Sequence, residues 1–143
     1  MSQVNPQSAF ATATAHAHTR VKPTILIAED SNDGREMMQM LLRLKGYKVL
    51  SAENGVGAVE AALTHRPDLI LLDWELPRLN GIGVTKILRS RQDFRNTPII
   101  IISGHDPAVH RQPAIEAGCT DYLMKPIDFE HLDTILNSAV PLS

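Results

Sequence analysis

Short apolar runs alternate with helical stretches from Thr24 to the end of the chain. Most of these runs are continuous Val, Ile and Leu without interspersed polar residues, a pattern typical of strands that are covered on both faces. The expected strands are Ile25–Ala28, Lys48–Ala52, Leu69–Leu72, Ile99–Ile102 and Tyr122–Met124. Such strands separated by helices predict an α/β domain built around a parallel sheet.

Helices are predicted over Asp33–Lys45, Gly55–His65, Ile82–Arg91 and Asp128–Ala139. In the first of them, one broad apolar face is expected to contain Met37, Met38, Leu41, Leu42 and Leu44. Two prolines, Pro107 and Pro113, fall between the fourth and fifth strands. Because an interior proline costs a helix roughly 3 kcal/mol, we expect the helix there to be shortened or displaced, starting near Arg111.

A length of 143 residues fits one domain. Residues 1–22 lack helical or strand periodicity, so we expect a flexible tail there, in which His16 and His18 form at best a weak metal site, and a folded domain over 23–143. The net charge of -2 argues against direct nucleic-acid binding. No run reaches the roughly 18 apolar residues of a membrane span, and the single Cys119 fits a reducing compartment, which predicts a cytoplasmic protein.

Polar side chains stand where the predicted strands end. Glu29 and Asp30 follow the first strand, Asp73 the third, Ser103 the fourth and Lys125 the fifth. Because parallel strands point the same way, their carboxyl ends share one edge of the sheet, where such folds bind ligands. We therefore expect these five residues to meet in one cleft.

Three carboxylates in one cleft repel one another unless a cation lies among them, and their hard oxygen ligands favour Mg²⁺. Lys125 supplies a charge for a phosphoryl oxygen, and Ser103 supplies a hydroxyl. Together these groups predict a phosphoryl-transfer site with Asp73 as nucleophile. The alternatives are that Asp30 only caps a helix, that Asp73 only starts a loop, and that Lys125 is only a turn residue.

The motifs Glu29-Asp30, Asp73-Trp74-Glu75-Leu76-Pro77-Arg78-Leu79-Asn80-Gly81, Ser103-Gly104 and Lys125-Pro126 resemble, in order and spacing, the signature of response regulator receiver domains of two-component systems. The resemblance covers residues 24–140. It implies a flavodoxin-like, doubly wound fold, with a five-stranded sheet of order 2-1-3-4-5 and helices on both faces. It also implies that the bond before Pro126 is cis.

By the same resemblance, Glu29, Asp30, Asp73 and the backbone carbonyl of Glu75 bind Mg²⁺. Asp73 accepts the phosphoryl group from a histidine kinase or phosphotransfer protein, and Lys125 pairs with that group. Ser103 and Tyr122 match the pair that switches conformation on phosphorylation, while Glu75 and His105 occupy positions that tune dephosphorylation.

The resemblance implies a signalling protein and not an enzyme, apart from its own phosphorylation and dephosphorylation. The chain ends soon after the last predicted helix, so we expect a stand-alone receiver domain. Such a domain would signal by binding an unidentified protein target. A homodimer is compatible with this expectation. Two alternatives stay open. One is a receiver-like interaction module that takes no phosphate. The other is a phosphatase of the haloacid-dehalogenase type, which strand order disfavours because its nucleophile follows the first strand.

Overall fold

The computed structural model describes residues 22–142, so residues 1–21 of the predicted tail, with His16 and His18, lie outside the described residues. Within this range a five-stranded parallel sheet has the order β2-β1-β3-β4-β5. The strands are β1 (Thr24–Ala28), β2 (Lys48–Ala52), β3 (Leu69–Asp73), β4 (Ile99–Ser103) and β5 (Asp121–Met124). The parallel sheet and the strand order implied by the resemblance are both confirmed.

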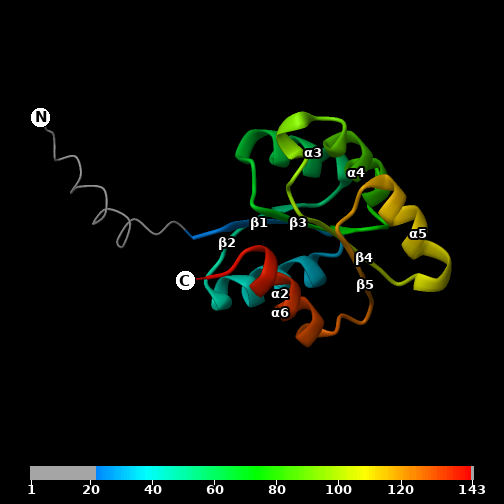
Figure 1. The fold of residues 1–143 in the computed structure, drawn as a ribbon. Coiled ribbons are helices and arrows are strands. Elements are labelled where there is room, and N and C mark those ends of the chain that lie inside the picture. Colours follow the sequence, from blue (N-terminus) through cyan, green and yellow to red (C-terminus); the bar gives the residue numbers. More distant parts are fainter. Residues whose placement is uncertain (1–21, 143) are drawn as a thin grey trace, which may run out of the picture.

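Helices cover both faces of the sheet (Figure 1). α2 (Asn32–Lys45) and α6 (Phe129–Ala139) lie on one face, whereas α3 (Gly55–His65), α4 (Gly81–Arg89) and α5 (Pro107–Ala117) lie on the other. A short 3-10 helix, η2 (Gln92–Phe94), follows α4. The three central strands are almost wholly buried because both of their faces are covered, which explains their uninterrupted apolar sequences.

The sheet divides the core in two. Ile25, Ile27 and Leu71 face α2 and α6, while Leu26, Ile70 and Leu72 face α3 and α4. Alternate residues of one strand point to opposite faces, so each central strand contributes to both cores. Consequently the carboxyl ends of β1, β3 and β4 are held in fixed register, with Ala28 beside Leu72 and Asp73 beside Ile102.

The expected position of the helix between β4 and β5 was wrong. α5 begins at Pro107 and not near Arg111, and it continues through Pro113. Asp106 caps the helix by accepting a hydrogen bond from the Ala108 N–H, and Pro107 stands in the first turn, where its fixed φ favours a helix. Pro113 cannot donate to the Val109 carbonyl, but both residues are exposed, so water can bond to that carbonyl and the interruption is tolerated.

The apolar face expected for α2 was too broad. Met38 and Leu42 are buried against the sheet, but Met37 is 53% exposed and Leu44 is 80% exposed. These two residues lie at one margin of the predicted face, beyond the part that the sheet can cover. Gly46 ends the helix in the left-handed conformation, as its position predicts.

Candidate phosphoryl-transfer site

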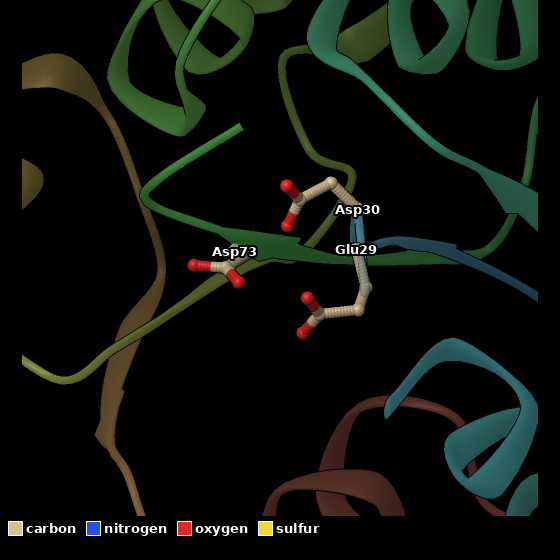
Figure 2. Close-up of side chains that lie close together, drawn as sticks. All are labelled: Glu29, Asp30 and Asp73. Carbon is tan, nitrogen blue, oxygen red and sulfur yellow. The ribbon is translucent and has the colours of Figure 1, made fainter. Parts of the chain in front are cut away.

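Three acidic side chains come together at the carboxyl edge of the sheet. Glu29 and Asp30 directly follow β1, and Asp73 is the last residue of the neighbouring β3. One carboxylate oxygen from each lies within 4.8 Å of the other two, and the three side chains are shown in Figure 2. Ser31, and not Asp30, caps α2 by accepting from the Gly34 N–H, so the helix-cap explanation does not account for Asp30.

The environment of Glu29 makes its charge costly. Partial burial raises the pKa of the Glu29 carboxyl, and the nearby Asp73 carboxylate raises it further. The Ser31 N–H, which donates to Glu29 Oε2 at 3.1 Å, and the charge of Lys125 oppose this effect only in part. A cation bound among these carboxylates would remove the cost.

Lys125 already supplies one positive charge to the cluster. It leaves β5 through a cis bond to Pro126, as the resemblance implies. Its Nζ lies 2.8 Å from Asp73 Oδ2 and 3.4 Å from Glu29 Oε1. Partial burial alone would lower the pKa of Lys125, but the hydrogen bond and charge of Asp73, together with Glu29, outweigh burial and raise it. Lys125 therefore stays charged at neutral pH.

Ser103 and Tyr122 lie on the adjacent strands and meet the same residue. The Ser103 hydroxyl, fully buried at the end of β4, accepts from the His105 N–H at 2.9 Å. The Tyr122 hydroxyl donates to the His105 carbonyl oxygen, also at 2.9 Å, and the ring packs beside Ala114 of α5. Hence the backbone of His105 connects the two predicted switch residues.

A group of side chains joins the β3–α4 loop to the start of α5. His105 Nε2 lies 2.6 Å from Glu75 Oε2, and the His105 ring stacks on that of His110 with centroids 4.4 Å apart. Trp74 approaches His110 edge-on at 5.0 Å. The contact between Glu75 and His105 and the part played by His110 were not predicted, because they depend on loop conformations that the sequence pattern does not encode.

A cavity of about 370 Å³ opens beside the acidic cluster. Glu29, Asp73 and Lys125 form its polar part, and Met37 and Phe129, from α2 and α6, contribute apolar walls. The carboxylate of Asp73 therefore borders the space between these two helices. Asp73 itself is only 7% exposed.

The donor set fits Mg²⁺. That ion prefers oxygen ligands, binds few protein carboxylates and keeps several waters, and the exposed Asp30 leaves space for water on one side. The Glu75 N–H donates to Asp73 Oδ1 at 3.0 Å, which orients the carboxylate while Lys125 holds Oδ2. This arrangement can bind a metal–phosphoryl group and offer Asp73 as nucleophile. Coordination by the carbonyl of Glu75 stays a prediction.

Residues 25–137 match the response regulator receiver domain family. The response regulator MprA of Mycobacterium sp. (strain KMS) is 37% identical over 108 residues, which make up 76% of this chain and 46% of MprA. The polar-differentiation response regulator DivK of Brucella anthropi is 33% identical over 104 residues, covering 73% of this chain and 85% of DivK. The chain thus spans less than half of the MprA relatives but most of DivK.

Solved structures agree with the sequence matches. The receiver domain of Francisella response regulator 1452 has a TM-score of 0.77 and 31% identity, covering 83% of this chain and 97% of that chain. The receiver domain of the sensor histidine kinase PA1611 of Pseudomonas aeruginosa has a TM-score of 0.77 and 32% identity, covering 85% and 100%, and holds a magnesium ion in its active-site cleft. This chain belongs to the response regulator receiver domain family of two-component signalling.

Proposed function

We propose that this chain is a phosphorylation-activated signalling switch in which Asp73 accepts a phosphoryl group from a histidine kinase or phosphotransfer protein. The observation that carries the proposal is the charge arrangement at the sheet edge. A nearly buried Asp73 contacts Lys125 at 2.8 Å, within a cluster of three carboxylates that suits Mg²⁺. The magnesium ion reported for the PA1611 receiver domain supports the same metal here.

In the proposed reaction, a carboxylate oxygen of Asp73 attacks the phosphorus of a phosphohistidine. The P–N bond breaks, its electron pair stays on the imidazole nitrogen, and an aspartyl phosphate forms. Glu29, Asp30, Asp73 and the Glu75 carbonyl would hold Mg²⁺, which would supply positive charge to neutralise the phosphoryl oxygens. Lys125 exchanges its contact with Asp73 Oδ2 for one with a phosphoryl oxygen.

Phosphorylation would alter the hydrogen bonds of Ser103. When its hydroxyl turns toward a phosphoryl oxygen, it must reorient relative to the His105 N–H, from which it now accepts. Tyr122 is bonded to the carbonyl of that same residue, so a shift of His105 would reach Tyr122 and the adjoining α5. The signal would then be a shift in the populations of two conformations of the surface formed by α5, β5 and α6. A protein partner would bind one of these conformations in preference to the other.

The proposed switch can be distinguished from two alternatives, a phosphate-independent interaction module and a phosphatase. The chain and its Asp73→Asn variant are incubated with Mg²⁺ and acetyl phosphate, and intact masses are measured. We expect the native chain alone to gain one phosphate. No gain in the native chain would favour a phosphate-independent interaction module, whereas a gain in both would place the phosphate on another residue. Steady turnover of p-nitrophenyl phosphate would instead indicate a phosphatase.

A further inference from the structure

Gly55, the first residue of α3, touches the backbone of the β3–α4 loop. A Cβ atom built on Gly55 would lie 1.7 Å from the carbonyl oxygen of Leu79 and 2.6 Å from its carbonyl carbon. The Gly55 N–H also donates to the carbonyl of Pro77 at 3.2 Å. Backbone therefore packs on backbone here, and no rotation of a side chain could make room for a larger residue at position 55.

The loop against which Gly55 packs, residues 74–80, joins Asp73 to α4. At its base, the Gly81 N–H donates to the Trp74 carbonyl at 2.9 Å. Near its start, the Glu75 N–H donates to Asp73 Oδ1 at 3.0 Å. The path of the loop thus sets the direction of the Asp73 carboxylate, and Gly55 contacts the far end of this same loop.

We propose that Gly55 is a positioning residue for the phosphorylation site. Its contact with Leu79 holds loop 74–80 in the conformation in which the Glu75 N–H donates to Asp73. The same contact keeps the loop beside the metal site. A methyl group at position 55 would have to move the Leu79 carbonyl from 1.7 Å to at least about 3.0 Å away. The inference rests on the proposed function, because it concerns Mg²⁺ binding and phosphorylation of Asp73.

The start of α3 does not itself require glycine at position 55. Asn54 caps the helix by accepting from the Gly57 N–H at 2.8 Å, and alanine is a better helix former than glycine. A Cβ on Gly57 would meet nothing closer than 3.5 Å. Gly57→Ala is therefore a matched control, because it adds the same methyl group to the same helical turn without contacting the loop.

The test compares the native chain, Gly55→Ala and Gly57→Ala. Thermal unfolding is followed by circular dichroism, Mg²⁺ affinity by isothermal titration calorimetry, and phosphorylation by acetyl phosphate at saturating Mg²⁺ by intact mass. For Gly55→Ala we expect about tenfold weaker Mg²⁺ binding, the lower end of the effect seen when the supports of metal ligands are removed, and slower phosphorylation. Gly57→Ala should match the native chain in both.

A folded Gly55→Ala chain with native Mg²⁺ affinity and phosphorylation rate would overturn the inference, even if its melting temperature fell. The inference would also be overturned if Gly57→Ala weakened Mg²⁺ binding and slowed phosphorylation as much as Gly55→Ala does. If Gly55→Ala does not fold, the native chain decides: the NMR signal of the Gly55 amide, whose N–H donates to the Pro77 carbonyl of the loop, must shift on saturation with Mg²⁺, and an unchanged signal would overturn the inference. A native chain that binds no Mg²⁺ or takes no phosphate would refute the proposed function itself, whereas an active native chain with unaffected variants refutes only the role of Gly55.

Discussion

Lys125 Nζ lies 2.8 Å from Asp73 Oδ2 and 3.4 Å from Glu29 Oε1, so one ammonium group partly neutralises two carboxylates that come from different strand ends. Asp30, the third carboxylate of the cluster, has no such contact with Lys125 in the described part of the chain. The site therefore keeps an excess of negative charge without metal. That excess is the physical basis for expecting a divalent cation.

Mg²⁺ should stabilise the native chain against unfolding, because the folded state binds it better than the unfolded state. At 100 times Kd the gain in the free energy of unfolding is about 2.7 kcal/mol, measured by urea denaturation with Mg²⁺ and with EDTA. Glu29→Gln should lose most of this gain. In EDTA it should be at least as stable as the native chain, since burial raises the pKa of Glu29 and makes its charge costly. Equal Mg²⁺ stabilisation of both chains would contradict the assignment of Glu29.

The pair Glu75–His105, whose side chains meet at 2.6 Å, should slow loss of the aspartyl phosphate. Their backbone N–H groups donate to Asp73 Oδ1 and to the Ser103 hydroxyl, so both side chains project from the loops that border the site, and their contact should restrict the approach of water. We expect a shorter phosphate half-life in Glu75→Ala and His105→Ala, measured by intact mass after removal of the phosphodonor. His65→Ala, at the exposed end of α3, should keep the native half-life. An unchanged half-life in both pair variants would refute this role.

Cys119 should be unreactive in the folded chain, because burial raises the pKa of its thiol to about 11. The unfolded thiol ionises near 9.0 and the folded thiol only near 11, so the unfolded state releases its proton first. The free energy of unfolding should therefore fall as pH rises from 9 to 11. In Cys119→Ala the fall should be shallower, with the raised pKa of Tyr47 still contributing. Identical slopes in urea denaturation of the two chains would contradict this prediction.

Arg78 has a φ of 72°, in the left-handed region that costs a residue with a side chain roughly 1–2 kcal/mol. Arg78→Gly relieves that cost but increases the conformational freedom of the unfolded chain, so we expect a net gain of up to about 1 kcal/mol in the free energy of unfolding. Arg95→Gly is the control, since Arg95 has a φ of -58° and the change should destabilise. The prediction fails if both variants lose stability equally in urea denaturation.

Much of the fold and the grouping of the site residues could be predicted from sequence, for a common physical reason. Strands such as Ile99–Ser103 are buried on both faces, so their apolar runs are uninterrupted and easily found. The parallel arrangement then forces the residues after each strand to one edge, which brings Asp73 and Lys125 together. The order of the strands in the sheet, by contrast, was predicted from the family resemblance and not from the strand sequences.

What could not be predicted depends on loops and on weakly packed surfaces. α5 buries only Ala114 and Ala117, so its start is decided by the cap at Asp106 and not by an apolar pattern. The contacts of Glu75 with His105 and of Gly55 with Leu79 join segments distant in sequence through irregular backbone. The periodicity of apolar residues in the sequence does not predict such contacts.

The central claim, that Asp73 is the phosphoacceptor, is tested most directly by trapping the acyl phosphate. The native chain is phosphorylated with acetyl phosphate and Mg²⁺, reduced with borohydride, digested and sequenced by mass spectrometry. Reduction of an aspartyl phosphate leaves homoserine at the modified position. We predict homoserine at position 73 and unmodified Glu29 and Asp30. Homoserine at position 30, or a reduced side chain at any position other than 73, would contradict the account.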